Sequence, residues 1–179
     1  MDDRHYLVDV RPILEDLGAI IPLDSDVDLP EIILGTEAFK PLRPGHLVAD
    51  VTNSGAGVVV SGSIDAEFEA ICSRCLREFP LRVTAAVEGF YVLPGDDVDI
   101  PEEQEVSYIA EGAFIDLMEQ LLSALVLELP FAPLHAEDCP GICPSCGADL
   151  EEGGCDCEPV SAESPFAALK DLLPRSDSE

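Results

Sequence analysis

Two stretches of alternating apolar and polar residues constrain the fold of this 179-residue chain more than any other feature. Apolar side chains occupy every second position between residues 64 and 70, and the same spacing recurs between residues 81 and 89. A period of two places successive side chains on opposite faces of a strand, so each stretch predicts a half-buried β-strand. The intervening segment ICSRCLREF (71–79) is then expected at a hairpin tip, and with it Cys72 and Cys75.

The remaining sequence adds short strands and one long helix. Leu117, Leu121 and Leu125 recur at helical spacing and are followed by a proline, which predicts a helix with one face on the core. Asp116 and Glu119 have the spacing of a capping box. Short strands are predicted near residues 6–10, 32–34, 47–51, 58–62 and 107–115, a short helix at 12–17, and acidic loops at 22–31 and 94–105.

The expected fold class is therefore α+β. A twisted antiparallel sheet, from about residues 46–115, is predicted to pack against the helix at 116–129. Residues 1–133 would form this core domain, 134–160 a small cysteine-rich, zinc-stabilised appendage, and 161–179 a short helix with a disordered acidic tail.

The run CPGICPSCGADLEEGGCDC (139–157) contains five of the seven cysteines. Cys143-Pro-Ser-Cys146-Gly has the form of a zinc knuckle, in which two thiolates bind one ion from a tight turn and the glycine permits a positive φ. All-cysteine zinc sites have no open position for water, which favours a structural role. Cys139 is a fifth candidate ligand. The predicted zinc ligands are Cys143, Cys146, Cys155 and Cys157.

The second motif, Cys72-Ser-Arg-Cys75, allows several interpretations. A redox pair of this spacing usually begins a helix, whereas strands are predicted on both sides here. Three interpretations remain: a half-knuckle that shares one site with Cys143 and Cys146, a partial metal site with Cys139 or His135, or two inert thiols.

Charge is distributed unevenly along the chain. Nine Lys and Arg oppose 37 Asp and Glu, for a net charge of −28. Such a field repels phosphate backbones and attracts cationic partners, although it also serves solubility alone. Residues 83–169 contain no Lys or Arg, whereas Arg74, Arg77 and Arg82 cluster around the hairpin tip. We expect an acidic face that binds a basic protein, with these three arginines as the RNA-binding residues.

Several function classes are not expected. The acidic N-terminus predicts no secretory signal, and the apolar stretch 114–129 carries charges that disfavour a membrane span, so a cytoplasmic protein is expected. Isolated histidines and the lack of a phosphate-binding glycine loop predict no enzymatic activity and no small-molecule substrate. The rival hypothesis is a metal-dependent RNA-processing nuclease that uses the carboxylates Asp96, Asp97 and Asp99, although catalytic carboxylates need rigid support.

Five motifs follow one another in a specific order: CSRCLREF (72–79), IDLMEQLLSALVLELPFAPLH (115–135), GICPSCGADL (141–150), CDC (155–157) and SPFAALKDLL (164–173). Together they resemble the YceD family, the large ribosomal RNA subunit accumulation proteins. The resemblance covers residues from about 57 to 173 and is loose in the N-terminal third.

This resemblance implies a non-catalytic ribosome-biogenesis factor that supports the accumulation of large-subunit ribosomal RNA. Its implied partners are a basic large-subunit ribosomal protein, beside whose gene family members commonly lie, and large-subunit rRNA itself. The family's central motif falls on Cys72, Arg74, Cys75 and Leu76, and its C-terminal cysteine set on Cys143, Cys146, Cys155 and Cys157. The acidic loop at 94–105 is not a family feature.

Overall fold

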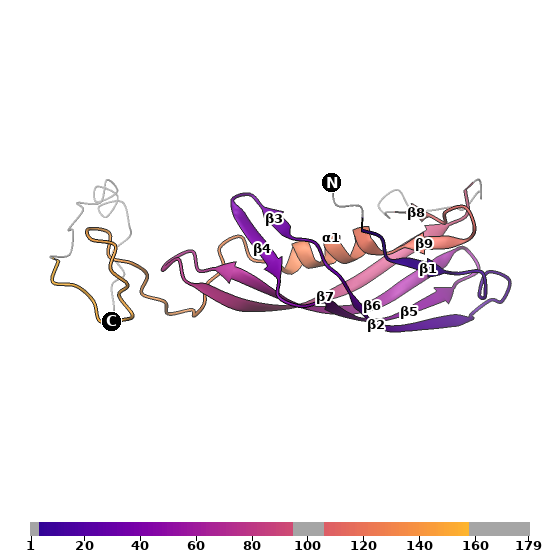
Figure 1. Cartoon of the computed structure of the whole chain (residues 1–179). Coiled ribbons are helices and arrows are strands. Elements are labelled where there is room, and N and C mark those ends of the chain that lie inside the picture. The colour runs from indigo at the N-terminus through magenta and orange to yellow at the C-terminus, as the bar shows by residue number, and fades with distance from the viewer. Residues whose placement is uncertain (1–3, 95–105, 158–179) are drawn as a thin grey trace, which may run out of the picture.

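The described residues form a mostly antiparallel sheet with one helix, which confirms the predicted α+β class (Figure 1). The computed structural model describes residues 4–94 and 106–157. The strands are β1 (Leu7–Asp9), β2 (Ile20–Val27), β3 (Ile32–Leu34), β4 (Glu37–Pro41), β5 (Gly45–Asn53), β6 (Val58–Ile71), β7 (Glu78–Val92), β8 (Ser107–Tyr108) and β9 (Phe114–Asp116), and the helix is α1 (Met118–Glu128).

The predicted long hairpin is formed by β6 and β7, which pair over the whole length of β6. Burial alternates along β6, where Ile64 and Phe68 are fully buried while Asp65 faces solvent. The period of two in the sequence therefore corresponds to one core face and one solvent face. The hairpin tip between the two strands contains Cys72 and Cys75, as predicted.

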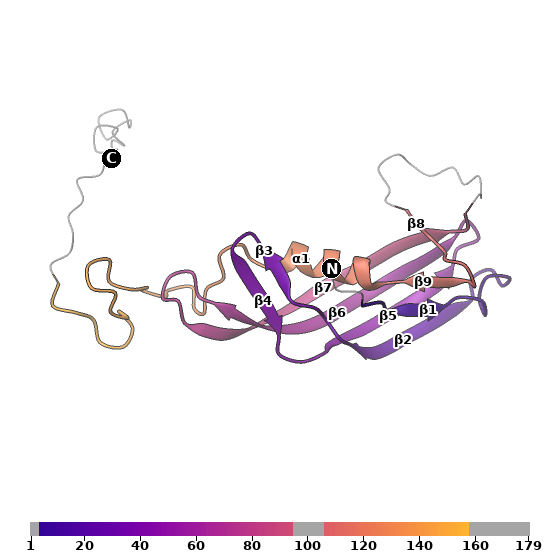
Figure 2. The same cartoon turned by 45° about the horizontal axis from the view of Figure 1, so that its top comes forward.

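β6 is the central strand of the larger sheet. β7 pairs with one edge, and the other edge is shared by β5 and, nearer the tip, by β4. β2 extends the sheet beyond β5, β3 pairs with β4, and β8 adds a two-residue parallel pairing to β7. β1 and β9 form a separate two-stranded ribbon. Seven strands thus form one sheet whose longest hairpin extends past its neighbours (Figures 1 and 2).

Helix α1 lies on one face of the sheet, over β7 (Figure 2). Leu121 and Leu125 are fully buried, whereas Leu127 is 84% exposed, so the predicted core face is confirmed. The helix begins at Met118 and not at residue 116. The predicted capping box is wrong, because Asp116 ends β9 and its carboxylate accepts hydrogen bonds from the backbone N–H groups of Tyr6 and Met118.

Two local predictions in the N-terminal third are wrong. Residues 22–31 were expected to be an acidic loop, but most of them belong to β2, so the sheet starts well before residue 46. Because β2 is an edge strand, it tolerates Pro22 and can expose Asp24 and Asp26 on its solvent side. The expected helix at 12–17 is a series of turns with i to i+3 hydrogen bonds. The Asn53 side chain fixes these turns by donating to two of their carbonyl groups.

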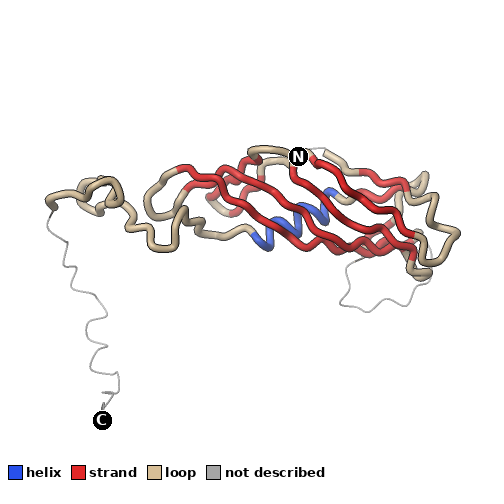
Figure 3. The backbone as a smooth tube through the Cα atoms, turned by 90° about the horizontal axis from the view of Figure 1, so that it is seen from below, coloured by secondary structure: helices blue, strands red, loops and turns tan. Residues whose placement is uncertain are grey.

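The cysteine-rich segment lies beyond the tip of the β6–β7 hairpin, at one end of the sheet (Figures 1 and 3). The predicted terminal helix and tail at 161–179, and the acidic residues 95–105, lie outside the described residues. Within the described part of the chain, no helix is long and apolar enough to cross a membrane.

Candidate metal centres

The hairpin tip folds Cys72-Ser-Arg-Cys75 into a tight turn. The backbone N–H of Cys72 donates to the carbonyl of Arg77, and the N–H of Leu76 donates back to the carbonyl of Cys72, both at 2.8 Å. Leu76 adopts a positive φ of 62° although it is not a glycine, and its side chain is 64% exposed. A left-handed conformation at such a residue costs on the order of 1–3 kcal/mol, so the surrounding contacts must hold it in place.

The second motif, Cys143-Pro-Ser-Cys146, has the same backbone hydrogen bonds at the same positions. The N–H of Cys143 donates to the carbonyl of Ala148, and the N–H of Gly147 donates to the carbonyl of Cys143, again at 2.8 Å. Gly147 has a φ of 74°, where the first motif has Leu76. Both motifs are therefore zinc-knuckle turns by backbone geometry, a shape that the sequence predicted for the second motif and left as one of three interpretations for the first.

The first knuckle belongs to a group of four side chains whose ligand atoms lie within 4.8 Å of one another. The hairpin tip supplies two of them, and the segment that follows α1 supplies the other two. Three of the four are buried and one is partly buried. This group, called the tip cluster below, consists of Cys72, Cys75, His135 and Cys139.

The second knuckle belongs to another group that meets the same distance limit. Only Cys143 is buried, and the other three cysteines are exposed. An isolated bridge between Ile142 and Asp149 closes the loop around the knuckle. This group, called the terminal cluster, consists of the four predicted ligands Cys143, Cys146, Cys155 and Cys157.

The structure therefore brings the four predicted cysteines together, and it separates Cys139 from them. The partial metal site weighed for the first motif is the interpretation closest to the structure, except that His135 and Cys139 both join Cys72 and Cys75. A site shared between the two knuckles is not formed. His135 was the residue least evident from sequence, and its signal was the spacing His-x3-Cys shortly after the helix.

All seven cysteines are free thiols. The Sγ atoms of Cys72 and Cys139 lie 3.8 Å apart, well beyond the roughly 2.05 Å of a disulfide bond.

The thiols in each cluster differ in how readily they ionise. Burial raises the pKa of Cys72, but hydrogen bonds from the backbone N–H groups of Cys75 and His135 outweigh it, and the pKa falls to about 5. Burial raises the pKa of Cys139 to about 11. In the terminal cluster, the backbone N–H groups of Cys146 and Ser145 lower the pKa of Cys143 to about 6. Each knuckle thus stabilises one thiolate, that of its first cysteine.

Thiolate and imidazole groups are the ligands that soft and borderline metal ions prefer. Each cluster offers four such ligands, the number required by a tetrahedral site. Both clusters therefore fit a metal ion by ligand type and number.

The three arginines predicted to bind RNA all have partners within the chain. Arg74 donates to the backbone carbonyls of Glu137 and Cys139, 3.1 and 3.0 Å away. Arg77 pairs with Asp149 at 2.9 Å. Arg82 pairs with a carboxylate on the neighbouring strand, but its own side chain remains 80% exposed. Arg82 thus faces solvent beside the sheet, while Arg74 and Arg77 connect the hairpin tip to the cysteine-rich segment.

One carboxylate joins the two clusters. Glu151 lies 3.0 Å from the guanidinium of Arg77 and 3.1 Å from Nε2 of His135. Because Glu151 follows the second knuckle while Arg77 and His135 belong to the tip region, the two clusters are linked by an ion-pair network.

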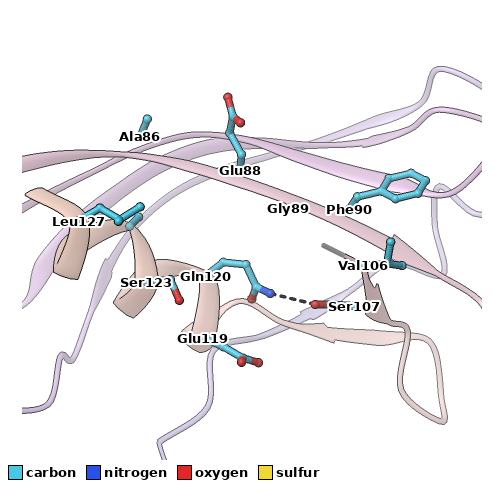
Figure 4. Close-up of a pocket in the computed structure, with 11 residues that line it drawn as sticks. Ala86, Glu88, Gly89, Phe90, Val106, Ser107, Glu119, Gln120, Ser123 and Leu127 are labelled. Atoms are coloured by element: carbon cyan, nitrogen blue, oxygen red, sulfur yellow. Dashed lines mark hydrogen bonds between the residues drawn. The ribbon is translucent and has the colours of Figure 1, made fainter. Parts of the chain in front are cut away.

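A cavity of about 680 Å³ lies between α1 and the end of β7 farthest from the hairpin tip (Figure 4). Among the described residues, its lining includes the carboxylates Glu88 and Glu119 but no histidine or cysteine. Gln120 donates to Ser107 at 3.0 Å, and its buried Oε1 atom has no hydrogen-bond partner among the described residues. The carboxylates of the rival nuclease hypothesis, at 96–99, lie outside the described residues.

Comparison with known proteins supplies relatives over most of the chain. Two proteins described as uncharacterized, from Mycobacterium bovis and Mycobacterium tuberculosis, are each 34% identical over 176 residues, covering 96% of this chain and 83% of the relative. A third, from Mycobacterium leprae, is 32% identical over 144 residues, covering 79% of this chain and 66% of the relative.

No solved structure matches the chain. The sequence model of one family, described as large ribosomal RNA subunit accumulation protein YceD, matches residues 60–173, a range that contains both cysteine clusters. This description implies a role in the accumulation of large-subunit ribosomal RNA. On the strength of this match, the chain belongs to the YceD family.

Proposed function

We propose that this protein is a non-catalytic ribosome-biogenesis factor that supports the accumulation of large-subunit rRNA by binding a basic ribosomal protein. The family match over residues 60–173 is the observation that carries the proposed role. The mode of action, binding through an acidic surface, is argued from the charges of the chain.

Electrostatics favour a protein partner over naked RNA. The net charge of −28 repels phosphate, and the stretch 83–169 contains no Lys or Arg of its own. A ribosomal protein rich in Lys and Arg would be attracted, and its association would slow as salt rises. Bound to an acidic partner, such a protein would be shielded from unspecific contacts until it meets its rRNA site.

Any direct contact with rRNA would be made by the hairpin, and chiefly by Arg82. Arg74 and Arg77 are engaged with carbonyl groups and carboxylates of the cysteine-rich segment. Arg82 is 80% exposed, and its partner Glu67 is also paired with Arg43, so Glu67 would keep one cation if Arg82 turned to phosphate. One arginine gives a weak and salt-sensitive contact.

The terminal cluster would hold zinc in a structural role. Four thiolates match the ligands of closed zinc sites, and such sites leave no position for a reacting water. The zinc would keep residues 143–157 folded, a segment too rich in glycine and polar residues to build a core of its own.

The proposal is tested by binding titrations of the zinc-loaded protein at two salt concentrations. One partner is a purified basic large-subunit ribosomal protein, and the other is naked large-subunit rRNA. We expect tighter binding to the protein partner, and weaker binding of both at the higher salt. Tight and salt-insensitive binding to naked rRNA would contradict the acidic-surface mechanism.

Two matched variants locate the RNA contact. Arg82→Gln should weaken residual rRNA binding, whereas Arg43→Gln, which removes the other partner of the same carboxylate, should not. Neither change should affect the protein partner. Magnesium-dependent cleavage of rRNA by the purified protein would instead favour a nuclease.

A further inference from the structure

The distances within the tip cluster match those of a tetrahedral zinc site. With Zn–S bonds of about 2.3 Å, two thiolates at the tetrahedral angle lie roughly 3.8 Å apart. The Sγ atoms of Cys72 and Cys139 are 3.8 Å apart. A thiolate and an imidazole nitrogen bound at about 2.3 and 2.0 Å would lie roughly 3.5 Å apart, and Cys75 Sγ lies 3.4 Å from His135 Nδ1.

The histidine is oriented as a metal ligand. Its Nδ1 atom points at the thiols, and its Nε2 atom lies 3.1 Å from a carboxylate oxygen of Glu151. Because a carboxylate accepts and does not donate, this contact places a proton on Nε2, so a neutral His135 ring would present its Nδ1 lone pair to a metal among the thiols. A carboxylate–histidine pair of this kind commonly supports a ligand histidine in zinc proteins.

The surroundings of the cluster are those of a closed structural site. Cys72 is fully buried, and Cys75 and Cys139 are 8% and 3% exposed. Phe79 and Leu134 pack against these thiols, and Phe79 also packs against the main core. Free cysteines that bind no metal do not need to be buried together in this way. A closed metal site, with four protein ligands and no access for water, does.

We propose that Cys72, Cys75, His135 and Cys139 form a second zinc centre, which fastens the β6–β7 hairpin to the segment that follows α1. Without a metal, this junction depends on a few hydrogen bonds, such as the one from the N–H of Ser73 to the carbonyl of Pro133. Ligation by both cysteines of the tip also accounts for the left-handed backbone at Leu76, because the knuckle needs that conformation to close.

This centre explains the position of two arginines. Zinc with three thiolates and one neutral imidazole carries a charge of about −1. The Arg74 guanidinium lies against the carbonyl of Cys139, and Arg77 lies in the network that includes the His135 partner Glu151. Two cations beside a buried anionic centre offset its charge, so their proximity to the tip is structural.

The test counts zinc in full-length protein purified with a reductant and passed through a desalting column. Wild type should carry two zinc ions per chain. Cys139→Ser and Cys146→Ser should each carry one, and the double variant none. The matched control is His46→Ala, a histidine on β5 that belongs to neither cluster and should leave the count at two.

A second measurement guards against loss of zinc through unfolding. His135→Cys keeps four ligands, so it should still bind two ions, whereas His135→Ala should bind the second ion at least tenfold more weakly. After substitution by Co²⁺, His135→Cys should also show stronger thiolate-to-cobalt absorption than wild type, because one nitrogen is replaced by sulfur. One metal ion per wild-type chain, retained in Cys139→Ser and lost in Cys146→Ser, would overturn the proposal. A cobalt spectrum unchanged by His135→Cys would overturn it as well. The result does not depend on the ribosomal role.

Discussion

Truncation of Leu121 measures how much of the fold depends on α1. Leu121 is fully buried on the face of the helix that meets the sheet. Leu121→Ala removes three carbon atoms, worth about 2.4 kcal/mol at roughly 0.8 kcal/mol for each buried methylene. The cavity left behind adds to this loss, and buried leucine truncations cost roughly 2–5 kcal/mol in total. We therefore expect a loss of about 3 kcal/mol in the free energy of unfolding.

Leu127→Ala is the matched control. It makes the same chemical change in the same helix, but Leu127 is 84% exposed, so the free energy of unfolding should change by less than about 0.5 kcal/mol. Urea denaturation in zinc-containing buffer gives both values while metal binding is held constant. For a protein of this size, a loss of 3 kcal/mol corresponds to a decrease in Tm of roughly 6–12 °C. A Leu121→Ala loss below about 0.5 kcal/mol, or equal to that of Leu127→Ala, would refute the burial of this face.

Three further predictions address the terminal cluster, the helix start and the sheet. Cys146→Ser should make residues 143–157 protease-sensitive while the sheet and helix survive, because a structural zinc site supplies on the order of 10 kcal/mol; a resistant segment would contradict this. Burial raises the pKa of Asp116, but hydrogen bonds from backbone N–H groups have the larger effect, so the pKa in the folded protein lies below its ordinary value. The ionised carboxylate therefore stabilises the fold above about pH 3.9, and this contribution is lost as the pH falls through the pKa of the folded state. Asp116→Asn should therefore flatten the acid limb of a urea-stability curve, and an unchanged limb would exclude this carboxylate as its cause. Gly62→Ala would place a Cβ 2.4 Å from the Cα of Ala49, so a loss of roughly 1–3 kcal/mol is expected in the same assay, and wild-type stability would disprove the close approach.

The main hairpin and the helix could be predicted from sequence because their signals are local and periodic. Alternation along β6 and the spacing of Leu121 and Leu125 each reflect one buried face. β2 could not be predicted in this way, because Asp24 and Asp26 and the proline at its start are typical of a loop. Its strand structure comes from pairing with β5, a contact between residues about 20–30 positions apart that no local pattern records.

The two clusters also differ in how close their ligands lie in the sequence. The four ligands of the terminal cluster lie within fifteen residues, so their spacing alone predicts a site. The tip cluster joins two pairs of ligands, Cys72 with Cys75 and His135 with Cys139, that are separated by 60 residues and by most of the fold. Neither pair alone predicts a metal site. The two pairs meet only because the residues after β6 and the residues after α1 lie together in the fold. The partners of Arg74 and Arg77 could not be predicted for a related reason, because Glu137, Asp149 and Glu151 also follow the helix.

The charges around the clusters also bear on where a basic partner would bind. If both clusters hold zinc, their thiolates add charges of about −1 and −2 to a region whose nearby arginines are already paired. Arg77 is shared among carboxylates and cannot offset all of them, and Glu152 is 78% exposed at 4.0 Å from its guanidinium. The end of the molecule that carries the cysteine-rich segment is thus acidic although it contains two of the nine basic side chains. A cationic ribosomal protein would meet there a surface whose rigidity depends on both ions, so the loss of either ion should weaken its binding by loosening that surface.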